Sequence, residues 1–292
     1  MPRLRRKTKA DRGPLPVWAA WVAIAGVAII LLAGIGVGVA KMTGSEHSPT
    51  SRSASSAPTP PPTSSLPAGA SQREREDAIA NQPMPEGDSS NLDPSNFKPK
   101  PEVQATTPGL NLPSGKKTDA GVRTGFTHTP EGAVAQLAAL NQAAYTNLDT
   151  QAGRNAYTAF AMPGAVPLEE WNPTKTVMRY YTDSPDTDPT RMRAQFVPVQ
   201  GLIKGSVGNN FTVVCVNGQL TYTYKSESNR VAVWDCARMR WDDKGDRWMI
   251  AAGATPARAP LTWPRSELSY RAGFRDPLSL IHISEPTRPR LI

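Results

Sequence analysis

An uncharged run at residues 16–40 constrains this chain more than any other feature. It reads PVWAAWVAIAGVAIILLAGIGVGVA and contains no Asp, Glu, Lys or Arg. As a helix rising about 1.5 Å per residue it would be about 37 Å long, enough to cross a hydrocarbon layer of about 30 Å. We therefore predict a membrane-spanning helix over residues 16–40, with Trp18 and Trp21 at the membrane interface.

The residues before this run predict its orientation. Residues 1–15 form a basic tail with one acid, Asp11, and six bases: Arg3, Arg5, Arg6, Lys7, Lys9 and Arg12. Cytoplasmic flanks carry the excess of Lys and Arg, so the tail is expected in the cytoplasm and the rest of the chain outside the cell membrane. Gly38 and Ala40 also resemble a cleavage site, but a signal peptide has an apolar core of only about 7–15 residues. An uncleaved single-pass anchor is therefore favoured over a cleaved signal.

The charge distribution argues against nucleic acid as a partner. The chain has a net charge of +8, which by itself would suggest a nucleic-acid binder. Most of that charge lies in the short tail, where it attracts anionic lipid. No basic and aromatic pattern of a nucleic-acid reader follows. We expect membrane lipid as a partner, and no direct readout of nucleic acid.

Residues 41–122 have the composition of a disordered linker. Most of the excess of the 29 prolines lies in this Pro/Ser-rich stretch, and large apolar side chains are few. Such a segment cannot offset the entropy cost of ordering it. We predict a flexible stalk that spans about 50 Å between its ends. A helix near residues 72–79 fits the local sequence, but nothing is expected to bury it.

Residues 123–277 have the pattern of an α+β domain that begins with helices. Thr129, Pro130 and Glu131 form a helix start, with a hydroxyl cap followed by proline and an acid. Apolar residues at helical spacing follow as far as residue 148. A second helix is predicted over 151–162. A third is predicted over 168–181, with Trp171, Met178 and Tyr181 on its apolar, inward face.

The second half of this domain has strand character. Alternating or β-branched residues predict five strands over residues 192–203, 211–216, 220–224, 231–241 and 247–251. Asn217-Gly218 has the sequence of a tight hairpin turn. Further turns are predicted at 226–229 and 242–245. The expected fold is α+β, with two or three helices packed on a curved antiparallel sheet and enough chain to bury a core.

The two cysteines leave two alternatives open. Cys215 and Cys236 both fall in the exported domain, where an oxidising compartment favours a disulfide. A turn at Asn217-Gly218 would instead place them two strands apart, at about 9.5 Å and on opposite faces. That exceeds the roughly 7 Å limit for bonded cysteines. A disulfide and two buried thiols therefore both remain.

No constellation of catalytic residues is evident. Residues 1–277 contain only His47 and His128, and no phosphate-binding glycine loop, dinucleotide fingerprint or nucleophile elbow. The acidic pairs and triplets at 169–170 and 183–188 lack the spacing of a calcium loop and are interpreted as solvated turns. We expect no enzymatic activity, no cofactor, no metal and no catalytic residue.

The order of these parts resembles a known architecture. A cytoplasmic tail, one span, a stalk, then helices and a meander that ends in DDKGDRWMIAA resemble the exported domains of bitopic scaffold proteins of conjugation and type IV secretion. GFTHTPEGAVAQLAAL is similar to the opening of an actinobacterial family of membrane proteins on mobile elements. The resemblance implies the fold named after nuclear transport factor two, and a scaffold that self-associates and contacts other subunits of a transfer machine in the cell envelope. It carries no catalytic residues.

Two other functional classes stay open. A cone-shaped sheet often encloses a cavity, so the exported domain could bind a ligand as a sensory module of the envelope. An enzyme of unrecognised type would require a cavity with clustered Asp, Tyr and Arg.

Residues 278–292 are interpreted as an artefact. LSLIHISEPTR resembles the translation of a widely used sequencing adapter, so the natural sequence is expected to stop near Pro277.

Overall fold

The computed structural model describes residues 69–86 and 94–278. The predicted tail, the span with Trp18 and Trp21, the first part of the stalk and residues 279–292 lie outside the described residues. The helices are α2 (Gln72–Asn81), α3 (Pro130–Tyr145), α4 (Thr150–Phe160), α5 (Asn172–Asp183) and α6 (Glu267–Arg271). The strands are β1 (Lys117–Asp119), β2 (Val122–Thr124), β3 (Met192–Val207), β4 (Phe211–Tyr224), β5 (Glu227–Asp242) and β6 (Arg247–Ile250).

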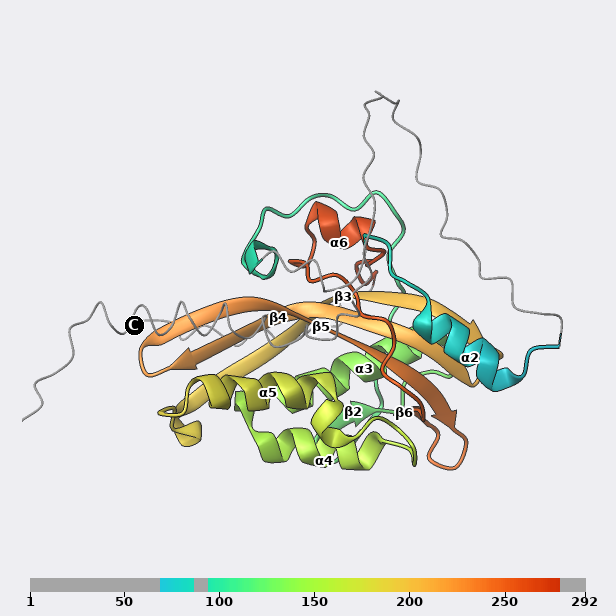
Figure 1. The fold of residues 1–292 in the computed structure, drawn as a ribbon, viewed down its shortest axis with the longest axis horizontal. Coiled ribbons are helices and arrows are strands. Elements are labelled where there is room, and N and C mark those ends of the chain that lie inside the picture. Colours follow the sequence, from blue (N-terminus) through green and yellow to red (C-terminus); the bar gives the residue numbers. More distant parts are fainter. Residues whose placement is uncertain (1–68, 87–93, 279–292) are drawn as a thin grey trace, which may run out of the picture.

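A curved antiparallel sheet divides the molecule into layers. Its four strands follow the order β3-β4-β5-β6, and β1 and β2 form a separate hairpin. Helices α3, α4 and α5 cover one face, here called the inner face, and α2 and α6 lie on the opposite, outer face (Figure 1). The predicted α+β class with helices on an antiparallel sheet is therefore confirmed.

The predicted turn at Asn217-Gly218 is wrong, because both residues lie inside β4. Gly218 pairs with Pro198 on one side and Val233 on the other. A Cβ atom on Gly218 would lie 2.4 Å from the Val197 carbonyl oxygen and 2.5 Å from the Phe196 ring. This glycine therefore serves close packing rather than a turn, and the two strands predicted around it are one. The chain reverses instead at Gly208 and Lys225, both with positive φ.

The helix starts follow the sequence closely. The Gly132 N–H donates to the Thr129 hydroxyl oxygen at 3.2 Å, and α3 begins at Pro130 as predicted. The inward face predicted for the third helix is partly wrong, since Met178 is 52% exposed. The buried residues of α5 are Pro173, Val177 and Tyr180. A 3-10 turn precedes α5, so Trp171 is buried from its cap position and does not set the phase of the helix.

The predicted disorder of residues 41–122 is wrong for the part that the structure describes. Helix α2 starts with a capping box between Ser71 and Glu74, and it buries Glu76 and Ala80 against the outer face of the sheet. Further along, Phe97 is only 3% exposed. The composition of this segment indicated too little apolar surface to order it. Ion pairs and backbone hydrogen bonds to the sheet provide stabilisation that the apolar surface does not.

Helix α2 is also held on the sheet by polar contacts. Arg238 contacts Asp77 at 2.5 Å, and Arg240 contacts Glu76 at 2.6 Å. At the end of the helix, the Lys204 ammonium donates to the carbonyl oxygens of Ala80 at 3.0 Å and Gln82 at 2.7 Å. Burial lowers the pKa of Lys204 to about 8. A cation at the C-terminal end of a helix also interacts favourably with the helix dipole.

Reversing the charge of Arg240 is expected to release α2. Arg240→Glu would face the buried Glu76 with a second carboxylate, and breaking a buried pair costs about 3–5 kcal/mol unless the local structure opens first. We expect amide exchange in α2 to rise at least about tenfold, measured by hydrogen exchange with mass spectrometry. The double variant Arg240→Glu with Glu76→Arg restores the pair and should recover most of the protection. Unchanged exchange in the single variant would contradict this account of the docking.

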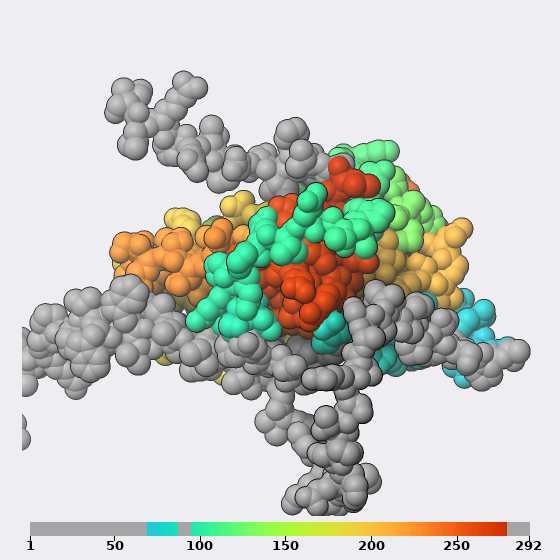
Figure 2. Space-filling model, turned by 90° about the horizontal axis from the view of Figure 1, so that it is seen from above, coloured from blue at the N-terminus to red at the C-terminus, as the bar shows by residue number. Residues whose placement is uncertain are grey.

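The outer face carries a second apolar layer. It packs the side chains of β4 and β5 against the C-terminal segment, with Leu261, Trp263 and Phe274 buried. Backbone bonds in both directions between Gly201 and Arg275, at 2.9 and 2.8 Å, join this segment to β3. Residues 94–116 cross over the C-terminal segment on the same side (Figure 2). The folded unit therefore includes segments that precede helix α3 in the sequence and segments that follow strand β6.

The two cysteines lie beneath this outer layer. Cys215 and Cys236 are direct partners on β4 and β5, with Cα atoms 4.0 Å apart, and the structure joins them in a disulfide. The expected separation of about 9.5 Å on opposite faces is wrong, because it depended on the turn at Asn217-Gly218. With β4 unbroken, both side chains point to the outer face and are 0% and 5% exposed.

Candidate binding site around Asp235

Asp235 occupies an inward position of β5 that the strand pattern would assign to an apolar residue. Its neighbours in the inward row, Val233 and Ala237, belong to the main core, whereas Trp234 and Cys236 face the outer layer. Asp235 is only 2% exposed. The alternation of β5 therefore places a carboxyl group between the sheet and the helices of the inner face.

Several polar groups without a partner surround this carboxyl group. Asp235 Oδ2 makes no hydrogen bond, and neither do both amide atoms of Asn141, the Tyr145 hydroxyl and the Trp171 indole N–H. A buried polar atom without a partner costs about 1–3 kcal/mol. Asn172 is different, since its amide donates to the Trp234 carbonyl oxygen at 2.6 Å and fixes the start of α5 on β5.

Burial dominates the electrostatics of Asp235. Desolvation raises its pKa from 3.8 to about 7, while the Cys236 backbone N–H, Asn141 and Trp171 oppose this shift by favouring the charged form. The Asn141 amide and the Trp171 indole N–H lie near this carboxyl group but do not meet the geometry of a hydrogen bond to it. The nearby Arg238 does not neutralise the carboxylate, because it points to the outer face and pairs with Asp77. Burial likewise raises the pKa of Tyr145.

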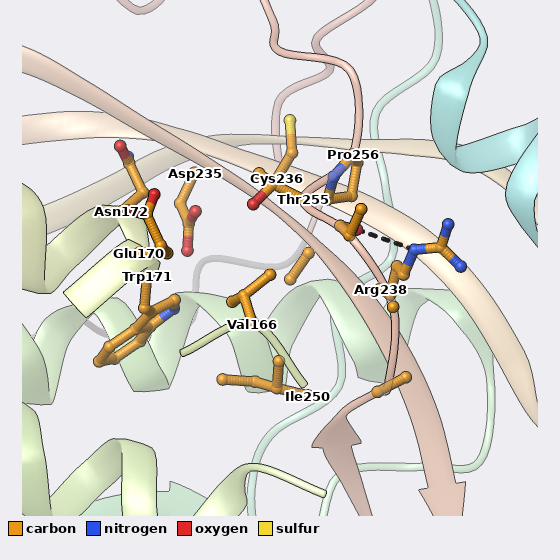
Figure 3. Close-up of a pocket in the computed structure, with 14 residues that line it drawn as sticks. Val166, Glu170, Trp171, Asn172, Asp235, Cys236, Arg238, Ile250, Thr255 and Pro256 are labelled. Atoms are coloured by element: carbon orange, nitrogen blue, oxygen red, sulfur yellow. Dashed lines mark hydrogen bonds between the residues drawn. The ribbon is translucent and has the colours of Figure 1, made fainter. Parts of the chain in front are cut away.

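A small pocket adjoins Asp235. Its walls come from the turn before α5 and the first residue of that helix (Glu170, Trp171 and Asn172), from β5, and from the segment that follows β6. In Figure 3 the Asp235 side chain points into the space between Trp171 and Val166. The cavity is small, about 20 Å³, with room for one or two water molecules or a group of similar size.

The residues weighed for chemistry in the sequence do not converge. His128 is exposed and stacks on Trp241, with ring centroids 4.1 Å apart and planes 9° from parallel. Glu170 pairs with Lys175 at 3.0 Å, and Asp183 with Arg179 at 2.6 Å. Within residues 69–86 and 94–278 no group of His, Cys, Asp and Glu side chains could hold a metal ion.

Sequence reasoning missed Asp235, although a signal was present. The segment VAVWDCARM places one acid in the middle of a strand whose neighbours at two-residue spacing are apolar. A charge at such a position is rarely buried without a partner. That mismatch between pattern and residue type could have marked Asp235 as a candidate for function.

Comparisons with known proteins do not assign this chain to a family. None of the helices in the part of the chain that the structure describes has the length and apolar character needed to cross a bilayer. No model of a protein family matches this chain, and neither does any curated protein or solved structure.

Proposed function

We propose that this protein is a non-enzymatic, single-pass scaffold of the cell envelope whose exported α+β domain acts through protein–protein contacts. Its N-terminus lies in the cytoplasm, and its partners are membrane lipid, further copies of itself and other subunits of a conjugation or type IV secretion apparatus. Three helices that precede a curved four-stranded meander and cover one face of it support assignment to the fold named after nuclear transport factor two.

The filled inner face of the sheet is the observation that carries this proposal. Large side chains occupy the space that a ligand would need: Tyr145, Phe196 and Trp248 are each no more than 1% exposed. The pocket at Asp235 is too small for a typical organic ligand, whose site measures about 300–1,000 Å³. A domain of this kind favours action through its surface over the alternative of an envelope sensor with a ligand in its cone.

The disulfide supports the exported location. Bonded cysteines persist in oxidising compartments and are rare in the cytoplasm of most organisms. The docked helix α2 also shortens the proposed tether to residues 41–71, for which a flexible chain spans about 30 Å. The domain is then held closer to the membrane than a stalk ending at residue 122 would hold it.

A deletion in the host tests the proposal. Removing the gene should lower DNA transfer or secretion by at least about tenfold, and the full chain should restore it. A matched variant that keeps residues 1–71 but lacks the folded domain should reach the membrane and fail to restore transfer. Protease added to intact cells should degrade the domain and spare the tail. Normal transfer in the deletion strain would count against the scaffold role, and a protected domain would count against the topology.

A further inference from the structure

We propose that residues 227–231 of β5, here called the free edge, pair with the same residues of a second copy of this chain, so that the two sheets become continuous. Strand β6 pairs with β5 only at residues 239–242. The part of β5 near the β4–β5 turn is therefore an edge of the sheet, at the end opposite to α2 (Figure 1). The inference rests on the proposed function, because it names how the scaffold self-associates.

The alternation of β5 identifies the backbone groups that point away from β4. The Asn172 amide donates to the Trp234 carbonyl oxygen at 2.6 Å from outside the sheet. The Ala251 N–H donates to the Arg238 carbonyl oxygen at 2.8 Å in the same way. Because β5 pairs with β4 without a bulge, all its even-numbered residues direct their N–H and C=O groups outward. In the free edge these residues are Ser228 and Arg230.

The backbone groups of the free edge are available for pairing. Within residues 69–86 and 94–278, no group is hydrogen-bonded to the backbone N–H or C=O of Ser228 or Arg230. Residues 227, 228 and 230 are exposed, and residues 229 and 231 are half-buried. The free edge ends before Ala232, which is only 5% exposed. An exposed edge of this kind is a template for another strand.

A two-fold axis through Asn229 sets the register of the pairing. Residue 229 is the middle of the free edge, so an antiparallel second copy places its Arg230 opposite Ser228, and its Ser228 opposite Arg230. Each pair exchanges both N–H···O bonds, so every outward N–H and C=O of the free edge finds a partner. An axis through Arg230 would instead set two guanidinium groups opposite each other and would require the buried Ala232 to pair.

Charge and topology favour a second copy as the occupant. The free edge has one acid, Glu227, and one base, Arg230, so it selects neither an acidic nor a basic strand. With the axis at Asn229, these two charges lie on opposite faces of the sheet, and no like charges are directly opposite. The other edge of the sheet is occupied where Gly201 exchanges backbone bonds with Arg275. Pairing therefore stops at a closed dimer and does not continue from copy to copy.

The pairing depends on the membrane for its strength. Five residues from each copy are far fewer than the about 20–30 residues per side of a stable interface. Anchoring two copies in one membrane raises their effective concentration without any new contact. The test therefore uses the full chain in a membrane.

Cysteine crosslinking in vesicles that contain only the purified full chain tests the pairing. Asn229→Cys places two thiols across the two-fold axis, where directly opposite Cα atoms lie about 4.5 Å apart and can be bridged. Thr221→Cys is the matched control, because it is exposed on the same hairpin but lies on β4, one strand in from the edge. The natural pair Cys215 and Cys236 is bonded and buried and does not compete.

Under mild oxidation with copper phenanthroline, Asn229→Cys should give at least about fivefold more crosslinked dimer than Thr221→Cys, because only its thiols meet the disulfide geometry. Equal crosslinking of the two variants would indicate random collisions and would overturn the proposal.

Two variants at Arg230, each combined with Asn229→Cys, separate backbone pairing from side-chain contact. Both lose the contact of the Arg230 guanidinium with the Trp263 ring at 5.5 Å. Arg230→Pro also removes the N–H that donates to the second copy, and proline is tolerated where a strand edge faces outward. It should lower crosslinking at least about fivefold, whereas Arg230→Ala should change it less than about twofold. Undiminished crosslinking in Arg230→Pro would overturn the backbone pairing.

The vesicles contain no transfer apparatus, so the test is independent of the scaffold role. A deletion strain with normal transfer would contradict the scaffold role and leave the crosslinked dimer in place. If Asn229→Cys stays monomeric in vesicles but crosslinks to another protein in host membranes, the edge binds a foreign strand, and the pairing between copies is overturned.

Discussion

Replacing Asp235 by Asn should stabilise the domain at pH 8 by up to about 4 kcal/mol. The native carboxyl group has a pKa of about 7, raised from 3.8 by burial. At pH 8 it must therefore be ionised in a buried site, at a cost of about 1.4 kcal/mol for each pH unit between the two pKa values. Asparagine keeps the shape and one acceptor oxygen, replaces the other oxygen by an NH2 donor, and carries no charge.

The pH profile gives this prediction its sign. Between about pH 4 and pH 7 the folded state holds a proton on Asp235 that the unfolded state has lost, so stability falls as pH rises through this window. Above pH 7 both states are ionised and this contribution stays lost. In Asp235→Asn the fall between pH 4 and pH 7 should be absent, apart from contributions of other groups.

Denaturant unfolding followed by circular dichroism from pH 4 to pH 9 measures the effect. Asp188→Asn is the matched control, because hydrogen bonds from Thr190 lower the pKa of that exposed carboxyl group. Its removal should not stabilise the domain at pH 8. A loss of stability in Asp235→Asn at pH 8 would mean that Asn141 and Trp171 hold the ionised form, and the burial argument would then be wrong.

Removing the disulfide is expected to destabilise the domain by about 3 kcal/mol. Cys215 and Cys236 are 21 residues apart in sequence, and a crosslink that closes a loop of this length restricts the unfolded chain by about that amount. Both cysteines are buried under the C-terminal layer, so Cys215→Ala with Cys236→Ala also removes some packing. For a domain of this size we expect the melting temperature to fall by about 10 °C.

Calorimetry with and without reductant separates the crosslink from the packing. Reductant added during unfolding should lower the melting temperature of the natural chain and leave the double alanine variant unchanged. Cys215→Ala alone is a useful comparison, because it leaves one free thiol and should melt near the double variant. A double variant that melts within about 2 °C of the natural chain would contradict the stabilising role of the bond.

The sequence predicted those parts of the fold that depend on neighbours along the chain. The cap at Thr129, the helix start at Pro130 and the strand character of residues 192–251 follow from contacts within a few residues. These signals give the α+β class and the order of helices before strands. The predicted membrane span has the same local basis, but it lies outside the described residues.

The tertiary structure alone decided what lies beside each strand. Asn217-Gly218 has the local sequence of a turn, yet Gly218 lies inside β4. There it leaves room for the ring of Phe196 on β3, which a side chain would clash with. The burial of α2 depends on Arg238 and Arg240, more than 150 residues away in the sequence. Local pattern could not foresee either outcome, because both depend on contacts that exist only after the sheet has formed.

The candidate site shows the same division. The sequence by itself determined that residues 231–241 form a strand and that two cysteines lie in the domain, because alternation and composition depend only on the order and type of residues. Only the tertiary structure decided that Cys236 meets Cys215 and that the Asp235 carboxyl group is buried on the inner face with an oxygen that has no hydrogen-bond partner. The physical reason is register: a shift of one residue exchanges the two faces of a strand, and long-range pairing sets it.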